Sequence, residues 1–204
     1  MIDTKIINAG LVTLGLNPSD LGKDLVRYLE QLAKWNRAFN LTAIREPSMM
    51  VTHHILDSLS VLPYVKADKM LDFGSGAGLP GIPLAMAKPD LAMVLLDSNS
   101  KKTRFLQQMV IELPLPNCRV VHARVENYDE VFEQIVCRAF SSLADIAAKA
   151  AHLLTADGEI LAMKAQLNDD ELKQDLGTFE IATVQKLDVP YLNADRHLVT
   201  LKKR

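Results

Sequence analysis

Cysteine is scarce in this chain: its 204 residues include only Cys118 and Cys137, and no CxxC pair. A disulfide framework and a zinc site built from paired cysteines are therefore excluded. Both thiols stand among apolar residues, where a cysteine usually behaves as a small buried hydrophobic side chain. We expect no metal site, and we expect Cys137 to be buried rather than to attack a pyrimidine base.

Long apolar runs are also missing. The longest one, residues 91–96, is far shorter than the roughly 20 residues that a membrane-spanning helix needs. The first residues include Asp3, Lys5 and Asn8, and they lack the basic start and the apolar centre of a secretory leader. We therefore expect a cytoplasmic protein with no membrane partner.

Neither sign of charge dominates the chain. The 23 lysine and arginine residues and the 25 aspartate and glutamate residues leave a formal net charge of −2. The overall field is not basic, so any binding of nucleic acid must depend on a local group of basic side chains. The 49% of hydrophobic and 24% of charged residues are typical of a globular protein with a sizeable core.

Hydrophobic spacing predicts a helical extension over residues 1–65 and a different organisation over residues 66–204. In the extension, apolar residues recur at helical spacing after Pro18 as far as Phe39, and a second helical stretch is expected from about Ser48 to the break at Pro63. Trp35 and Phe39, four residues apart, are expected to pack in the core of this extension.

Short apolar runs alternate with amphipathic stretches from residue 66 onward. This alternation is typical of a parallel sheet with helices on both faces, and two final strands with no helix between them indicate an antiparallel edge. The fold class is therefore α/β, with a mostly parallel seven-stranded sheet that follows the helical extension in the sequence. The predicted strands are 69–73, 91–96, 118–122, 134–139, 158–164, 179–189 and 198–202, and the predicted helices are 79–87, 100–113 and 143–154.

A glycine-rich loop follows the first predicted strand. Gly74, Gly76 and Gly78 form a GxGxG pattern, and Leu79 stands where the dinucleotide fingerprint GxGxxG needs a glycine or alanine. Glycines allow positive φ and a close approach of a ligand to the backbone. Asp97 ends the next strand, where a carboxylate can accept both hydroxyl groups of a ribose. Loop and acid together predict a site for an adenosine-containing ligand.

Three kinds of protein remain open on these residues alone. They are an S-adenosylmethionine-dependent methyltransferase, a nicotinamide-dependent oxidoreductase and a non-catalytic module that binds the cofactor. The GxGxG spacing and Leu79 count against the oxidoreductase.

Longer motifs narrow these alternatives. Asp72 stands two residues before the glycine loop, which resembles the first motif of Rossmann-like S-adenosylmethionine-dependent methyltransferases. Over essentially its whole length the chain resembles the bacterial 16S ribosomal RNA guanine-N7 methyltransferase family RsmG, also called glucose-inhibited division protein B (GidB). The segments that carry the resemblance are WNRAFNLTAI (35–44), HILDS (54–58), GLPGIPL (78–84), RAF (138–140) and RHL (196–198).

The resemblance implies a Rossmann-like methyltransferase fold, S-adenosylmethionine as the cofactor, and methyl transfer to N7 of a specific guanine in 16S ribosomal RNA of the small ribosomal subunit. It implies cofactor contacts at Gly74, Leu79, Val125, Glu126 and Arg138, and the loop argument adds Gly76, Gly78 and Asp97. The chain departs from the family pattern at Cys137, where a serine is common, and at Ala165, where a glycine is frequent.

Guanine N7 carries a lone pair, so it can attack a methyl group without first losing a proton. No general base is therefore expected, and His54 is expected to be structural; the candidates for positioning the reactants are Arg138, Arg124 and Lys164. The expected partner is 16S ribosomal RNA in the small subunit or an assembly precursor, and the protein is expected to be monomeric. The candidate RNA contacts are Lys101, Lys102, Arg104, Arg124, Lys164, Arg196 and His197.

Overall fold

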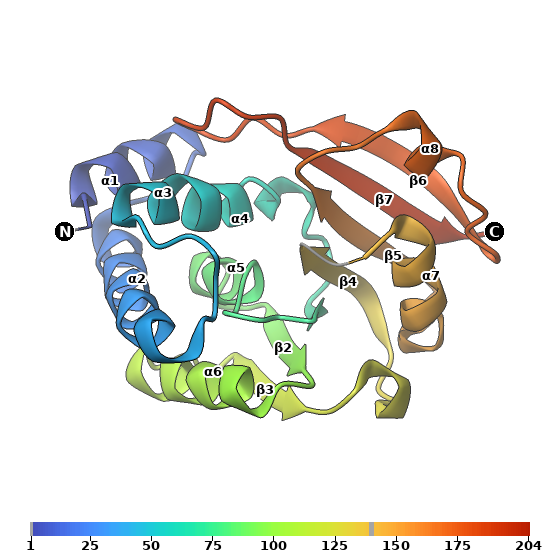
Figure 1. Cartoon of the computed structure of the whole chain (residues 1–204), viewed down its shortest axis with the longest axis horizontal. Coiled ribbons are helices and arrows are strands. Elements are labelled where there is room, and N and C mark those ends of the chain that lie inside the picture. The colour runs from blue at the N-terminus through green and yellow to red at the C-terminus, as the bar shows by residue number, and fades with distance from the viewer. Residues whose placement is uncertain (1, 139–140) are drawn as a thin grey trace.

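A computed structural model describes residues 2–138 and 141–204 (Figure 1). Seven strands form one sheet in the order β3-β2-β1-β4-β5-β7-β6. The first five pair in parallel, and β7 runs antiparallel to both β5 and β6, so the predicted sheet with its antiparallel edge is confirmed. The strands are β1 (Lys69–Phe73), β2 (Ala92–Asp97), β3 (Cys118–His122), β4 (Phe132–Arg138), β5 (Leu154–Lys164), β6 (Phe179–Lys186) and β7 (His197–Lys203).

Strand ends differ from the prediction where the pairing is irregular. β5 begins at Leu154 rather than at 158, because Leu154 pairs with Phe132 before the register shifts and Glu159 pairs with Gln134. Residues 155–157 of this irregular stretch are half-buried or exposed, so they lack the apolar pattern of a strand. The predicted end of β4 at residue 139, and the RAF motif beyond Arg138, lie outside the described residues.

The N-terminal extension is helical, as predicted. It consists of α1 (Thr4–Thr13), α2 (Ser19–Phe39), α3 (Pro47–Met50), the π-helical turn η1 (Val51–Leu56), α4 (Asp57–Leu59) and a 3-10 turn (Leu62–Tyr64). α2 ends where Asn40 adopts a left-handed conformation, with φ of 50°. The second predicted helical stretch, from Ser48 to Pro63, is confirmed, but η1 divides it with wider hydrogen bonds that hydrophobic spacing does not reveal.

The helices of the sheet region are α5 (Gly81–Ala87), α6 (Ser100–Glu112), α7 (Leu143–Ala150) and the short α8 (Asp169–Leu172), which was not predicted. α5 begins two residues later than predicted, because the amides of Gly78 and Leu79 first close a turn on the Ser75 carbonyl at 2.7 and 3.1 Å. α7 ends at Ala150 and continues as a 3-10 turn (Ala151–Leu153) into β5.

Alternate strand residues enter two hydrophobic cores, one on each face of the sheet. Met70 belongs to the core that the N-terminal helices share with α5 and α6, whereas Leu71 belongs to the core under α7. The proposed boundary at residues 65/66 falls within the first of these cores, so a division into two parts stays a prediction. No helix in the described part of the chain is long and apolar enough to cross a membrane.

Two aromatic residues of α2 behave differently. Trp35 packs against Phe105 of α6 with ring centroids 5.6 Å apart, as expected for a core residue. The ring of Phe39 lies tilted against Trp35, with centroids 5.3 Å apart, but Phe39 is 41% exposed, which corrects the prediction that it is a core residue. It is the last residue of α2, where the chain turns away from the packed face.

Candidate active site

The glycine loop has the backbone conformation that its sequence predicts. Gly74, Gly76 and Gly78 have φ values of 69°, 58° and 86°, a backbone region that residues with a Cβ atom rarely adopt. The amides of Gly74 and Ser75 both donate to the carbonyl of Leu96, at 2.9 and 3.0 Å. These bonds hold the loop against the carboxyl end of β2, where open parallel sheets bind their ligands.

The glycines differ in what surrounds them. A Cβ atom at Gly76 would meet no atom nearer than the Gly74 carbonyl oxygen at 3.8 Å, apart from its chain neighbours. A Cβ atom at Gly78 would lie 2.4 Å from Cδ1 of Ile82 and 2.9 Å from Cδ2 of Leu106. Gly78 therefore allows close packing beneath the loop, and it does not line the cavities described below. A cofactor contact at Gly78 stays a prediction.

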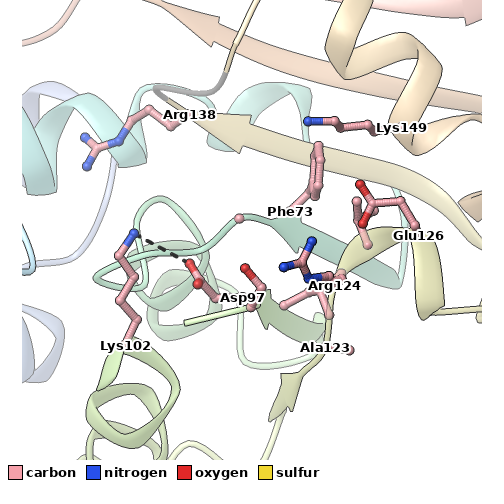
Figure 2. A pocket seen from close by; sticks show the side chains of 12 residues that line it. Phe73, Asp97, Lys102, Ala123, Arg124, Glu126, Arg138 and Lys149 are labelled. Atoms are coloured by element: carbon pink, nitrogen blue, oxygen red, sulfur yellow. Dashed lines mark ion pairs between the residues drawn. The ribbon is translucent and has the colours of Figure 1, made fainter. Parts of the chain in front are cut away.

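Asp97 is tied to the loop as well as to its own turn. Its Oδ2 accepts a hydrogen bond from the Gly76 amide at 2.9 Å, and its Oδ1 accepts one from the Asn99 amide at 2.8 Å. Lys102 Nζ lies 3.9 Å from Oδ2 (Figure 2). A carboxylate can accept about four hydrogen bonds, so Asp97 retains acceptor positions for hydroxyl groups of a ligand.

A cavity of about 490 Å³ opens beside Asp97 (Figure 2). Val125 and Glu126 reach it from a 3-10 turn (Val125–Asn127) that follows β3. Its volume lies in the range of about 300–1,000 Å³ that is usual for small-molecule sites. Among the predicted cofactor residues, Gly74, Asp97, Val125, Glu126 and Arg138 line this first cavity; its other lining residues are Phe73, Leu96, Ser98, Lys102, Ala123, Arg124 and Lys149.

A second cavity of about 590 Å³ adjoins the first. Gly74, Lys102 and Arg138 line both cavities, so the two meet at these residues. Gly76 and Leu79 face the second cavity rather than the first. The second cavity is further lined by Leu41, Thr42, Ala43, Ile44, His53, His54 and Asp57 of the N-terminal extension, by Ser75 and Ala77, by Met163, Lys164, Ala165 and Gln166, and by Arg196.

The second cavity contains an ion-pair cluster that the sequence reasoning missed. Asp57 Oδ2 accepts a hydrogen bond from Arg138 Nη1, and Asp57 Oδ1 accepts one from Arg196 Nε, both at 3.0 Å. Arg138 Nη1 also donates to the carbonyl of His53 at 2.8 Å. The motif HILDS contains Asp57 and was the available signal, but it does not reveal these partners.

Comparison with known proteins decides the family. The family described as rRNA small subunit methyltransferase G (GidB) matches residues 22–199. The chain belongs to this family. A ribosomal RNA small subunit methyltransferase G from Nitrosococcus oceani is 49% identical over 207 residues, covering 100% of this chain and 96% of that protein. One from Alkalilimnicola ehrlichii is 46% identical over 197 residues, covering 95% and 90%.

Solved methyltransferase structures share the fold. The glycopeptide N-methyltransferase MtfA matches with a TM-score of 0.62 and 11% identity, covering 74% of this chain and 96% of that one. TrmN from Thermus thermophilus matches with a TM-score of 0.58 and 18% identity, covering 83% and 53%. At such low identity the likeness shows the fold alone, and it confirms the Rossmann-like methyltransferase fold.

The N-terminal extension of this family member contacts the glycine loop directly. The hydroxyl of Tyr28, a fully buried residue of α2, donates to the Ala77 carbonyl at 2.6 Å. Burial raises the pKa of Tyr28 far above its ordinary value, so the hydroxyl keeps its proton at neutral pH. This hydrogen bond therefore fixes the position of the glycine loop relative to α2.

Asp72 lies behind the loop, completely buried, and lines neither cavity. Its Oδ2 accepts a hydrogen bond from the amide of Gly81 at 3.0 Å, whereas its Oδ1 has no hydrogen-bond partner among the described residues. Burial raises the pKa of Asp72 from 3.8 to about 7. The position suits a structural acid that anchors the start of α5.

His54 is buried and lines the second cavity. Its Nε2 lies 2.9 Å from the hydroxyl of Thr42, whose amide in turn donates to Asn36 Oδ1 at 2.9 Å. Burial and the nearby charge of Arg138 lower the pKa of His54 to about 3. His54 is therefore neutral at physiological pH, which agrees with a structural role.

The cysteines do not provide a nucleophile. Cys137 is 1% exposed, and burial raises the pKa of its thiol to about 12. Cys118 is only partly buried, but burial likewise raises its pKa to about 12. Both thiols stay protonated at neutral pH.

The predicted RNA contacts lie at different depths. Lys101 and Arg104 are exposed on α6, while Lys102 lines both cavities. Arg124 is exposed and lines the first cavity, so it borders the site proposed for the cofactor. These placements leave the RNA contacts as predictions.

Of the other candidates, Lys164 and Arg196 line the second cavity, and His197 follows Arg196 in the chain. Lys164 Nζ lies 2.6 Å from Glu171 Oε1 of α8 and donates to the Ser141 carbonyl at 3.2 Å. Arg196 is held by Asp57 inside the cavity, and His197 begins β7 half-buried, opposite Lys164 in the strand register.

Proposed function

We propose that this protein transfers a methyl group from S-adenosylmethionine to N7 of a specific guanine in 16S ribosomal RNA of the small subunit. The observation that carries the proposal is the meeting of two cavities at Gly74, Lys102 and Arg138. A cofactor in the first cavity and a base in the second would bring a methyl group and its acceptor together there. Family membership and the names of the relatives support ribosomal RNA of the small subunit as the substrate.

The residues around the first cavity fit the proposed cofactor. Asp97 lines this cavity, and its free acceptor positions suit a ribose; the Gly76 amide, on the side of the second cavity, holds Asp97 Oδ2 in place. The turn at Val125 and Glu126 offers backbone and carboxylate groups to an adenine. When bound, S-adenosylmethionine supplies an electrophilic methyl group. Arg138 borders both cavities, so it contacts the region between cofactor and substrate.

The second cavity suits a neutral aromatic base. Leu41, Ile44, Leu79 and Met163 offer apolar surface to the faces of a purine, and Thr42 adds a polar group. A base must leave its stack or already be unpaired to enter such a cavity. We expect a preassembled RNA to present it in that state.

The titratable groups of the second cavity agree with a reaction that needs no general base. His54 has a pKa lowered to about 3, and both carboxylate oxygens of Asp57 are engaged by arginines. The guanine N7 lone pair forms the new bond to carbon without prior loss of a proton. Catalysis then rests on holding N7 and the methyl group at reacting distance, an effect worth several kcal/mol.

Arginine must not read guanine through O6 and N7 together here. That bidentate contact is common in nucleic-acid recognition, but it would occupy the lone pair that has to react. We propose that the base is recognised through its other edges. The net charge of −2 further implies that a few converging basic residues and a folded RNA shape, rather than a general attraction, bring the RNA to the site.

The experiment incubates the purified protein with small ribosomal subunits from cells that lack it and with S-adenosylmethionine labelled in the methyl group. We expect label in 16S RNA, released on digestion as N7-methylguanosine, and much less label in naked short RNA or large subunits. Titration with S-adenosylmethionine and with NAD distinguishes the oxidoreductase alternative. Cofactor binding without transfer to any subunit preparation would favour a non-catalytic module, and label in another nucleoside would overturn the N7 assignment.

The protein is further proposed to act as a monomer in the cytoplasm. Gel filtration with light scattering of the purified protein tests the monomeric state, and a mass of two chains would contradict it.

A further inference from the structure

A single buried carboxylate joins three separate parts of the second cavity. Asp57, whose side chain is 4% exposed, belongs to the N-terminal extension. Its two oxygens accept hydrogen bonds from Arg138 at the end of β4 and from Arg196 just before β7, at 3.0 Å each. The arginine side chains are 16% and 15% exposed, so this is a largely desolvated cluster in which geometry is strongly held.

The π-helical turn η1 leaves the His53 carbonyl free to accept a second hydrogen bond from Arg138. In a regular α-helix the amide of Asp57 would donate to the carbonyl of His53, four residues earlier. Here the Asp57 amide donates to the carbonyls of Thr52 and His54 instead. The His53 carbonyl accepts from Arg138 Nη1 at 2.8 Å, so the carboxylate and this carbonyl fix the same guanidinium nitrogen.

We propose that Asp57 is a positioning residue for methyl transfer, which acts by holding Arg138 and Arg196 at the substrate side of the junction between the cavities. The inference rests on the proposed function. Both carboxylate oxygens of Asp57 accept hydrogen bonds from arginines, so Asp57 affects the reaction by positioning these two side chains. Their guanidinium groups keep further donors that can meet the incoming nucleotide, since each forms only part of its five hydrogen bonds with Asp57.

The two arginines should respond differently to the loss of Asp57. Arg138 lines both cavities and keeps its bond to the His53 carbonyl, so its place beside the cofactor is retained. Arg196 lines only the second of the two cavities, and its Nη1 donates to the neighbouring carbonyl of Asp195 at 2.8 Å. Removal of the carboxylate should therefore affect the handling of RNA far more than the affinity for S-adenosylmethionine.

The experiment compares the wild type with Asp57→Asn, Arg196→Gln and the double variant. Asp57→Asn keeps the shape and one acceptor oxygen but removes the charge. We expect kcat/KM for small subunits to fall about tenfold to a hundredfold, because small misplacements near reacting atoms have effects of that size. We expect the Kd for S-adenosylmethionine to change by less than about threefold, because Asp57 does not line the first cavity. A simple loss of folding would instead lower kcat/KM and weaken cofactor binding together.

The double variant tests whether Asp57 acts through Arg196. If the two residues form one unit, the double variant should be within about twofold of the weaker single variant, whereas independent roles would multiply the defects. Glu159→Gln is the matched control. Glu159 is also a buried carboxylate with two partners, Gln134 Nε2 at 2.7 Å and Lys202 Nζ at 3.4 Å, but it lines neither cavity, and its variant should methylate subunits as the wild type does.

Several results would overturn the proposal. Asp57→Asn with more than about half of the wild-type kcat/KM excludes a positioning role, as do equal losses of transfer and cofactor affinity or multiplied defects in the double variant. If Asp57→Asn does not fold, Arg196→Gln breaks the same contact from the other side, and full activity in that folded variant refutes the inference. A wild type that binds S-adenosylmethionine but methylates no guanine refutes the proposed function itself, and the positioning role falls with it.

Discussion

The buried acid behind the glycine loop makes the stability of the protein depend on pH in a defined way. Burial raises the pKa of Asp72 in the folded state from 3.8 to about 7. The folded protein therefore binds the proton more tightly than the unfolded chain does. The stabilising contribution of protonated Asp72 is complete below pH 4 and is lost as the pH rises toward 7.

The magnitude follows from the two pKa values. Each pKa unit corresponds to about 1.4 kcal/mol, so the full difference is about 4 kcal/mol, and about 3 kcal/mol of it falls between pH 5 and pH 8. Asp72→Asn cannot ionise, and its side-chain oxygen can still accept the bond from the Gly81 amide. Its amide group also replaces the Oδ1 atom that lacks a hydrogen-bond partner, which adds a constant offset that does not vary with pH.

The assay is urea unfolding of the wild type and Asp72→Asn at pH 5, 6, 7 and 8 without cofactor. The free energy of unfolding of the variant minus that of the wild type should rise by about 3 kcal/mol from the lowest to the highest pH. A difference that stays constant across this range would refute the reasoning, because Asp72 would then ionise in the fold as easily as in the unfolded chain. The sign of the constant offset is not part of the test.

Three further predictions concern the cofactor side of the site. Tyr28→Phe leaves the Ala77 carbonyl without its partner, so the free energy of unfolding should fall by about 1–3 kcal/mol in urea unfolding; the partly exposed Tyr128→Phe is the control, and an equal loss in both variants would contradict a special role of the contact. Asp97→Asn can no longer accept from Gly76 and Asn99 and also bind a ribose, so titration should show S-adenosylmethionine affinity lowered about tenfold or more, and unchanged affinity would remove Asp97 from the site. Gly76→Ala should weaken cofactor binding more than Gly78→Ala does. Gly78→Ala should lower the melting temperature more, because its Cβ atom would lie 2.4 Å from Cδ1 of Ile82. The opposite ranking of the two variants would contradict the proposed position of the cofactor beside the loop.

Local patterns explain why much of the fold and part of the site could be predicted. Strand and helix periods identified all seven strands, and the demand for positive φ identified Gly74, Gly76 and Gly78 as a loop. Because the ends of parallel strands meet at one edge, Asp97 was expected near this loop, whereas Val125 was implied by the family resemblance; both line the first cavity.

Contacts between distant segments could not be derived in this way. Asp57 lies 81 residues from Arg138 and 139 residues from Arg196, and neither separation leaves a trace in hydrophobic spacing. The π-helical turn that frees the His53 carbonyl depends on one displaced hydrogen bond inside an otherwise helical segment. The contact of Tyr28 with the glycine loop spans 49 residues and likewise arises only from the packing of α2 against α5 and α6.

The most direct test of the central claim is a map of N7-methylguanine in 16S ribosomal RNA from cells with and without this protein. We expect one guanine that carries the modification in the presence of the protein, loses it when the protein is absent, and regains it when the wild-type chain is restored. An unchanged pattern of N7-methylguanine in cells without the protein would contradict the proposed methyl transfer.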